Sequence, residues 1–299
     1  GKYYPIAVRG VKIPKPKGGY RQLGIPTVKD RLVQQAILQV LSLRYERIFS
    51  DYSYGFRPGR SAHQALQQAG AYVESGKRYV VDLDLAKFFD EVNHDRLLHL
   101  LSTRIGDKRL LKLIHRFLKA GMLEGGLMNQ RIKGTPQGGP LSPLLSNIVL
   151  DELDKELERR GHCFVRYADD VIVLVGSERS AERVQNSLIN YLEGELRLKV
   201  NRQKSRIVKC WAINFLGHGV NADGSLILSR SREDRLKGKL RQLTRRNRGC
   251  SFDQLIAQIN RRMQGWLHYF RYAKMRKKLA SLWSWLKHRL RCYRLKQCK

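Results

Sequence analysis

Two adjacent carboxylates, Asp169 and Asp170, stand between two largely apolar runs, residues 163–166 and 171–175. Both runs are rich in residues that favour buried strands, so Tyr167-Ala168-Asp169-Asp170 is predicted to form the tip of a β-hairpin. Neighbouring side chains of a regular strand point to opposite faces, but a turn removes that restriction. Two carboxylates at one tip can offer hard oxygen ligands to one or two Mg²⁺ ions, the arrangement used in phosphoryl transfer. Taken alone, such a pair is more often turn chemistry only, because Asp bonds its own backbone in turns.

A second apolar strand, within residues 79–90, also ends in carboxylates. Asp82 and Asp84 stand two apart and share a face of that strand, so spacing alone does not decide which of them binds metal. Between the two acidic segments, residues 134–147 read Gly-Thr-Pro-Gln-Gly-Gly-Pro-Leu-Ser-Pro-Leu-Leu-Ser-Asn. This composition predicts a turn that runs into a helix.

The motifs occur in the order found in reverse transcriptases, and the chain resembles that family. Asp84 with Phe89 and Asp90 resembles the first catalytic motif, the hairpin resembles the second, and residues 134–147 resemble the motif between them. Residues 13–21 and 54–61 upstream, and residues 215–218 and 265–270 downstream, are close to the bacterial group II intron-encoded reverse transcriptases and maturases. The resemblance covers nearly the whole chain, and several long motifs in order are more specific than the hairpin alone.

The resemblance implies an α+β fold with the right-hand polymerase architecture. Fingers and palm, built on an antiparallel sheet, are expected over residues 1–229, and an all-α, three-helix thumb of the maturase X type over residues 230–299. Many relatives carry a C-terminal metal-dependent endonuclease domain, of which the sequence has no trace. Gly1 stands already at the segment before Ile13-Pro14-Lys15, so the N-terminal extension of full-length relatives is expected to be missing.

The same resemblance implies a metal triad of Asp84, Asp169 and Asp170. Two Mg²⁺ ions are expected, with Mn²⁺ as a possible substitute: one lowers the pKa of the primer 3′-hydroxyl, and the other orients the triphosphate and neutralises pyrophosphate as it leaves. Asp82 and Asp90 then tune the site or make structural bonds. Lys204 resembles the lysine that protonates pyrophosphate, although neighbouring basic residues would equally suit plain phosphate contact.

Four residues resemble the family's nucleotide-binding positions. Phe89 resembles a steric gate that excludes a 2′-hydroxyl and so selects deoxynucleoside triphosphates; the alternative is a core aromatic, which we prefer for its neighbour Phe88. Gln137 resembles the residue that contacts incoming nucleotide and template, beside glycines that allow close backbone approach. Lys15 and Arg21 resemble finger residues that grip the triphosphate, with a solvated surface charge as the alternative for each.

The charge of the chain points to a polyanionic partner. The 299 residues include 58 Lys and Arg against 26 Asp and Glu, a net charge of +32. Residues 230–299 hold 22 of the basic residues and 3 of the acidic ones, which gives +19. In this part Trp266 and Phe270 are expected in the core, and Arg261, Arg262 and Arg271 on phosphates.

Other patterns exclude several classes of protein. The sequence has no run of 18 apolar residues that would suggest a membrane span and no secretory signal pattern. Its five cysteines form no Cys-x-x-Cys pair, which argues against a disulfide framework or a zinc module. We therefore expect a protein of the reducing bacterial cytoplasm that associates with nucleic acid. Cys292 and Cys298 are expected to be ordinary helix residues.

The element boundaries follow from caps and periodicity. Thr27 with Asp30 predicts the start of a helix, and Ser61 the start of the next. Further helices are predicted over residues 93–104, 107–120, 142–160 and 180–192, with short strands near 205–209 and 213–228. In the helix 142–160 the apolar stripe is expected to face a sheet, with Glu152, Asp154, Lys155, Glu156 and Glu158 on the other side. Three helices, roughly 231–247, 251–273 and 275–297, complete the chain.

The resemblance thus implies an RNA-directed DNA polymerase that extends a DNA or RNA primer with deoxynucleoside triphosphates on an RNA template, and that also binds structured intron RNA to assist splicing and mobility. A maturase acting mainly as an RNA-binding splicing cofactor is one alternative, and a domesticated enzyme of repair or phage defence is another. Intact carboxylates favour catalysis, since a pure RNA-binding protein has no need to hold them against a polyanion. The sequence is consistent with any oligomeric state.

Overall fold

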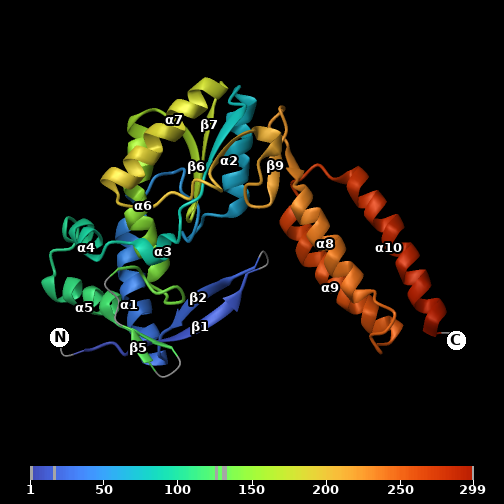
Figure 1. The fold of residues 1–299 in the computed structure, drawn as a ribbon, viewed down its shortest axis with the longest axis horizontal. Coiled ribbons are helices and arrows are strands. Elements are labelled where there is room, and N and C mark those ends of the chain that lie inside the picture. The colour runs from blue at the N-terminus through green and yellow to red at the C-terminus, as the bar shows by residue number, and fades with distance from the viewer. Residues whose placement is uncertain (1–2, 16–17, 125–126, 130–132, 298–299) are drawn as a thin grey trace. The chain divides into compact units, whose positions relative to one another are not determined.

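The computed structural model describes residues 3–15, 18–124, 127–129 and 133–297 (Figure 1). By their internal contacts the residues form two compact units. The first comprises residues 1–65 and 81–207, and the second comprises residues 66–80 and 208–299. No helix in the described part of the chain is long and apolar enough to cross a membrane.

A small sheet near the N-terminus is built on a hairpin. Strands β1 (Val8–Pro14) and β2 (Tyr20–Ile25) pair antiparallel, and β4 (Met122–Glu124) and β5 (Leu127–Asn129) extend the sheet in the order β2-β1-β4-β5. Strands β4 and β5 were not predicted from the sequence, because strands of three residues are too short to show an alternating pattern.

A second sheet carries the acidic segments, in the order β6-β7-β3-β8. Its strands are β6 (Cys163–Tyr167), β7 (Asp170–Val175), β3 (Tyr79–Leu83) and β8 (Arg206–Lys209). The predicted hairpin is confirmed: β6 and β7 are antiparallel, and Tyr167 pairs with Asp170. Helices α6 (Ser142–Arg159) and α7 (Glu178–Asn190) pack against these strands, and α7 runs into a π-helical turn, Tyr191–Glu195 (Figure 1).

Side-chain caps begin three other helices of the first unit, and Thr27 was predicted as one of these caps. Thr27 begins α1 (Val28–Tyr45), Asn93 begins α4 (His94–Ser102) and Asp107 begins α5 (Lys108–Lys119), and each side chain accepts a backbone N–H of the first turn. The short α3 (Phe88–Glu91) follows β3 after Lys87, whose φ is +50°.

One prediction for α6 is wrong. Asp154 was expected on the solvent side, but it is fully buried, and Asp151 on the same helix is buried as well. Asp154 has a buried partner, because Arg166 of β6 binds its carboxylate with two nitrogen atoms. The pattern of a helix surface does not show this, because the partner lies on another element.

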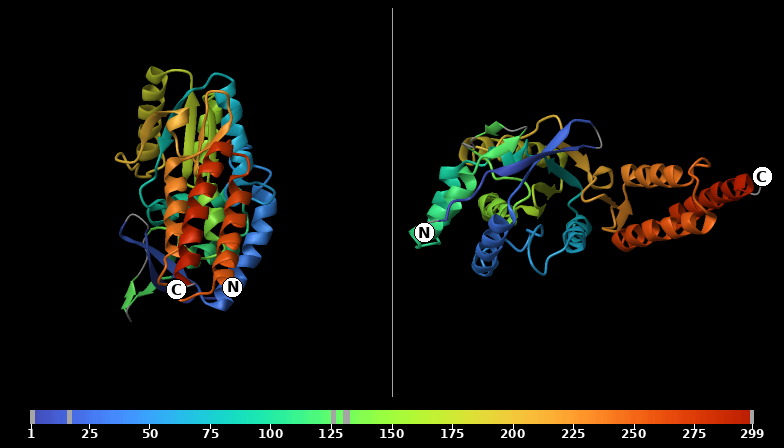
Figure 2. Two further views of the ribbon diagram at one scale, coloured as in Figure 1. Left: turned by 90° about the vertical axis from the view of Figure 1, so that its right-hand side faces the viewer. Right: turned by 90° about the horizontal axis from the view of Figure 1, so that it is seen from below.

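The second unit ends in a three-helix bundle. The helices are α8 (Arg230–Leu243), α9 (Phe252–Phe270) and α10 (Arg276–Gln297), which lie side by side in Figures 1 and 2. Leucines of all three helices form one core with Ile259 and Tyr293. The capping box at Ser251 and Gln254 fixes the start of α9. The three predicted helices are confirmed, with shorter ends.

The rest of the second unit includes α2 (Ala62–Glu74), most of which belongs to it, and the hairpin of β9 (His218–Val220) and β10 (Leu226–Leu228). Short strands were predicted near residues 213–228, and a turn at Asn221–Gly224 joins the two that form. The first strand begins only at His218, because Leu216 and Gly217 both adopt positive φ and bend the chain.

Candidate active site

The hairpin tip presents the two adjacent carboxylates in different positions. Because Tyr167 pairs with Asp170, the loop consists of Ala168 and Asp169, while Asp170 is the first residue of β7. Ala168 has a φ of +58°, and a positive φ at the first loop position is typical of a type II′ hairpin turn. Alanine in this left-handed region is uncommon, so the surrounding structure must hold the turn in place.

Asp84 follows directly after β3, and two hydrogen bonds of its backbone fix its position. Its N–H donates to Ser205 Oγ at 3.1 Å, and its carbonyl accepts from the N–H of Asn201 at 2.8 Å. Asn201 and Ser205 belong to one turn, which also brings Lys204 Nζ to 3.6 Å from Asp84 Oδ2. The predicted lysine and the predicted metal ligand are therefore neighbours.

The electrostatics show that the carboxylates of the two strand ends are crowded. The pKa of Asp170 is raised to about 6, first by loss of hydration around its carboxyl group and then by the negative charges of Asp169, Asp82 and Asp84. Burial also raises the pKa of Asp82, and Arg206, whose Nε lies 3.2 Å from Asp82 Oδ2, opposes that shift.

The donor set suits a hard divalent cation. All four side chains offer carboxylate oxygens, which such ions prefer, and their mutual repulsion is relieved when a cation binds. Within the ranges that the structure describes, however, no group of three or more His, Cys, Asp or Glu side chains is close enough to hold a metal ion. The structure brings Asp84, Asp169 and Asp170 into one acidic neighbourhood without closing them around a single point.

Phe89 lies on α3 and Gln137 lies on the turn before α6, and a backbone hydrogen bond joins these two segments. Phe88 is buried, as preferred from the sequence, whereas Phe89 is half-buried, with its ring centroid 5.4 Å from that of Phe88. The carbonyl of Phe89 accepts from the N–H of Thr135 at 2.7 Å, so α3 is tied to the turn that contains Gln137. His94, to which the sequence assigned no role, is buried and bonds the carbonyl of Gly134 at 2.7 Å.

The same turn lies against the end of β2. The N–H of Gly24 donates to the carbonyl of Gln137 at 2.8 Å, and a Cβ on Gly138 would lie 2.9 Å from the carbonyl oxygen of Gly24. Backbone thus approaches closely at Gly138, whereas Gly139 lies against the side chain of Gln34. Lys15 and Arg21 are exposed on the β1–β2 hairpin, and no contact recorded among the described residues joins them to the carboxylates.

Comparison with known families decides the family of this chain. Residues 13–220 match the family model described as reverse transcriptase (RNA-dependent DNA polymerase), and residues 234–299 match the group II intron maturase-specific domain. The chain belongs to the reverse transcriptase family. Membership implies the use of divalent metal ions, in agreement with the acidic neighbourhood of this reverse transcriptase.

Individual relatives give the same result. Protein YkfC of Escherichia coli is 34% identical over 303 residues, which cover 87% of this chain and 77% of YkfC. The group II intron-encoded protein LtrA of Lactococcus lactis is 32% identical, over 77% of this reverse transcriptase and 49% of LtrA. The retron Mx65 reverse transcriptase of Myxococcus xanthus is 31% identical, over 78% of this chain and 55% of that protein. The chain thus spans about half the length of two of these relatives.

Solved structures confirm the predicted fold class. A telomerase of Candida tropicalis has a TM-score of 0.59 at 15% identity, over 75% of this chain and 55% of that one. A telomerase of Candida albicans has a TM-score of 0.60 at 13% identity, over 97% of this chain and 59% of that one. This reverse transcriptase therefore has the α+β, right-hand polymerase fold.

In the three-helix bundle of this reverse transcriptase, the residues predicted for the core are more buried than those predicted for the surface. Phe270 is buried and Trp266 is half-buried. Arg261 and Arg262 are exposed on α9, and Arg271, at its end, stacks on the Tyr272 ring at 4.8 Å from the centroid. All three arginine side chains are exposed to solvent. Cys163, Cys210, Cys250 and Cys292, the described cysteines, are free thiols, and Cys298 lies outside the described residues.

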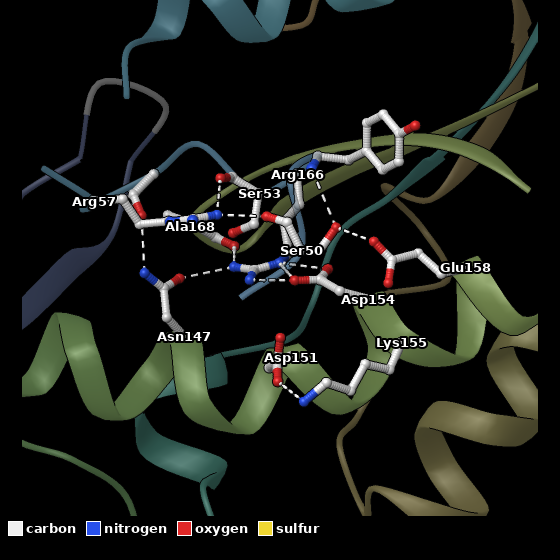
Figure 3. Close-up of polar contacts among 12 residues, drawn as sticks. Ser50, Ser53, Arg57, Asn147, Asp151, Asp154, Lys155, Glu158, Arg166 and Ala168 are labelled. Atoms are coloured by element: carbon white, nitrogen blue, oxygen red, sulfur yellow. Dashed lines mark hydrogen bonds and ion pairs between the residues drawn. The ribbon is translucent and has the colours of Figure 1, made fainter. Parts of the chain in front are cut away.

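Sequence reasoning missed the residues behind the hairpin of this reverse transcriptase. Arg166, Asp154 and Asn147 form a buried polar network there (Figure 3), and Gly55 lies against the turn. One signal for the network was present: Arg166 is the only charged residue between His162 and Asp169, and a charge within an apolar strand needs a buried partner.

Proposed function

We propose that this chain is an RNA-directed DNA polymerase of the group II intron type, which extends a primer 3′-hydroxyl with deoxynucleoside triphosphates. The observation that carries the proposal is the crowding of Asp84, Asp169 and Asp170, with Asp82, at the ends of β3 and β6–β7. A binding protein gains nothing from placing four carboxylates together on a chain of net charge +32.

Asp84, Asp169 and Asp170 are the residues that would hold two divalent ions, Mg²⁺ with Mn²⁺ as a substitute. When bound, such ions lower the pKa of the attacking hydroxyl and neutralise the leaving pyrophosphate. Lys204, 3.6 Å from Asp84, is placed to donate a proton to the leaving group. Its ammonium also offsets part of the acidic charge while the site is empty of phosphate.

The remaining site residues act on the nucleotide. Phe89 is half-buried beside the acidic segment and would lie under the sugar, where its ring excludes a 2′-hydroxyl. Gln137 would contact the base pair that forms, because its turn is tied to both α3 and β2. Lys15 and Arg21, exposed on the β1–β2 hairpin, would bind triphosphate oxygens.

The nucleic acid partners are an RNA template and a DNA or RNA primer. Arg261, Arg262 and Arg271 are exposed, and they would contact backbone phosphates with the other basic residues of the bundle. The likeness to LtrA, named as a group II intron-encoded protein, supports structured intron RNA as a further ligand.

Primer extension tests the polymerase proposal directly. The purified chain is given a DNA primer annealed to an RNA template, deoxynucleoside triphosphates and Mg²⁺. We expect extension to the template end, and the absence of extension on every RNA template tried, with DNA binding intact, would contradict the proposal. Asp95→Asn is a suitable control variant, because Asp95 is exposed on α4, and we expect it to retain activity.

A splicing role is the second candidate. The match of residues 234–299 to the maturase-specific domain favours it. If RNA folding is the main activity, the chain accelerates splicing of its cognate intron RNA, and Asp84→Asn leaves that acceleration unchanged. A repair or defence enzyme would instead lack any neighbouring intron RNA with splice junctions.

A further inference from the structure

A buried guanidinium stands directly behind the catalytic hairpin. Arg166 of β6 is fully buried, and Nε and Nη2 donate to the Asp154 carboxylate at 2.8 and 2.5 Å. Nη1 donates to Asn147 Oδ1 at 2.8 Å and to the carbonyl of Ala168 at 3.0 Å (Figure 3). One side chain therefore links helix α6 to the first loop residue of the hairpin.

Gly55 lies against the backbone of the same turn. A Cβ at this position would lie 2.2 Å from the backbone nitrogen of Ala168 and 2.9 Å from the carbonyl carbon of Tyr167, so a larger residue would displace the turn. Asn147 links Gly55 to Arg166, because its Nδ2 donates to the carbonyl of Gly55 at 2.9 Å while its Oδ1 accepts from Arg166.

The segment that carries Gly55 is itself fixed. Arg57 is buried, and its Nη1 donates to the carbonyls of Ser50 and Ser53 at 2.5 and 2.7 Å. The backbone of Arg166 exchanges two hydrogen bonds of 2.9 Å with this segment, one to the carbonyl of Tyr52 and one from the N–H of Tyr54. The loop that places Gly55 against the turn is therefore itself held by hydrogen bonds.

This network is poorly explained by stability alone. A buried ion pair costs much of its attraction in lost hydration, and apolar residues of similar size often serve stability as well. Buried polar groups do specify one arrangement, because a different arrangement would leave them without partners. Here the specified arrangement includes the left-handed Ala168, which persists only where its surroundings determine it.

We propose that Arg166, Asn147 and Gly55 are positioning residues that hold the turn of the catalytic hairpin, and with it Asp169 and Asp170, in one conformation. The inference rests on the proposed function, in which these carboxylates serve nucleotidyl transfer. The positioning residues touch neither substrate nor metal, and they act through the backbone of Ala168.

Asn147→Leu is the principal variant, because it removes both amide bonds and keeps the branched shape of the side chain. Gly55→Ala places a methyl group against the backbone of Ala168. Asn147→Asp keeps the acceptor for Arg166, but it loses the donor to Gly55 and adds a negative charge. Lys155→Gln is the matched control: it breaks the ion pair with Asp151 on the same helix, and no hydrogen bond or ion pair among the described residues joins that pair to the hairpin.

Four measurements are made on each full-length variant: the melting temperature, amide hydrogen exchange of peptides covering residues 163–175, single-nucleotide addition kinetics, and affinity for the primer-template. For Asn147→Leu and Gly55→Ala we expect exchange at the tip to accelerate at least about tenfold while the strand interiors stay protected. We expect kcat to fall about 100-fold, with KM for the nucleotide and affinity for primer-template within threefold of wild type. Asn147→Asp should retain part of kcat, and Lys155→Gln should lower only the melting temperature, leaving exchange at the tip, kcat and KM unchanged.

Two results would overturn the proposal. One is wild-type exchange at the tip together with wild-type kcat in Asn147→Leu and Gly55→Ala. The other is a loss that follows melting temperature alone, so that Lys155→Gln or a mild denaturant reproduces it at equal stability. If one of the variants at Asn147 and Gly55 does not fold, the comparison is made on the other two. If none of the three folds, the network serves stability and the positioning proposal is overturned. An inactive wild type would contradict the proposed function instead, while hydrogen exchange would still decide the positioning claim.

Discussion

At the scale of single residues, the four carboxylates differ in how their charge is balanced. Asp84 has Lys204 at 3.6 Å and Asp82 has Arg206 at 3.2 Å. The carboxyl group of Asp170 instead loses hydration by burial and lies near three negative charges, and both effects raise its pKa to about 6. The excess negative charge therefore lies at the hairpin, which is where a cation would bind most favourably.

This imbalance predicts a pH-dependent effect of Asp170→Asn. A carboxyl group whose pKa rises from 3.8 to about 6 on folding opposes folding: the penalty is absent below pH 4, grows between pH 4 and 6, and is complete above pH 6. Without divalent ions, Asp170→Asn should melt at a higher temperature than wild type at pH 7.5, and the difference should vanish near pH 4. Thermal melts of both proteins and of Asp95→Asn measure it, and a constant difference across the range would refute the crowding.

A second residue-scale prediction concerns Phe89. If its half-buried ring lies under the sugar, Phe89→Ala makes room for a 2′-hydroxyl. Discrimination against ribonucleotides should fall by about 10- to 100-fold, chiefly through faster ribonucleotide addition. Single-nucleotide kinetics with matched ribo- and deoxynucleotides measure the ratio. Unchanged discrimination would make Phe89 a packing residue beside Phe88.

At the scale of elements, much was predictable because it is local. The caps at Thr27, Asn93 and Asp107 need only a few neighbouring residues, and the hairpin at Ala168 and Asp169 follows from the apolar runs that flank it. The family motifs also predicted that Asp84 would lie near the hairpin, although they are far apart in sequence.

What could not be predicted depends on distant partners. Asp154 looks like one more acidic residue of a helix surface until Arg166 is known to lie behind it. Gly55 looks like a turn glycine, but the structure shows that the backbone of Ala168 occupies the space of a side chain. Strand β4 pairs with β1, which is more than 100 residues away in the sequence, as well as with its neighbour β5. Each of these features is set by tertiary packing, which no local window contains.

The contact of the 134–142 turn with β2 predicts the effect of Gly138→Ala. Gly138 has a φ of +127°, and its missing side chain leaves space for the carbonyl of Gly24. The substitution should cost about 1–3 kcal/mol of stability from backbone strain and should raise KM for the nucleotide, because Gln137 moves. Gly76→Ala is the control, with a φ of +95° in open space: it should lose similar stability and keep its KM. An equal KM for the nucleotide in both variants would mean that this turn has no part in nucleotide binding.

At the scale of the whole molecule, the charge of +32 predicts strongly salt-dependent binding. Each phosphate contact adds about −0.9 to the slope of log affinity against log salt on duplex DNA, and about −0.7 on single strands. Changing Arg261, Arg262 and Arg271 to Gln should shallow the slope for an RNA–DNA primer-template by about 2. The control changes Lys108, Arg179 and Arg183, which are exposed on α5 and α7. Equal slopes in the two triple variants would mean that the bundle arginines make no special phosphate contacts.

The central claim is that the acidic neighbourhood performs nucleotidyl transfer, and single-turnover addition of one deoxynucleotide on an RNA template tests it most directly. The assay compares wild type with Asp169→Asn, at saturating Mg²⁺ and with primer-template binding measured in parallel. Loss of a metal ligand removes several kcal/mol of transition-state stabilisation, so we predict a rate at least about 1000-fold lower with affinity for the primer-template within threefold of wild type. An Asp169→Asn variant that adds the nucleotide within a few-fold of the wild-type rate would contradict the account.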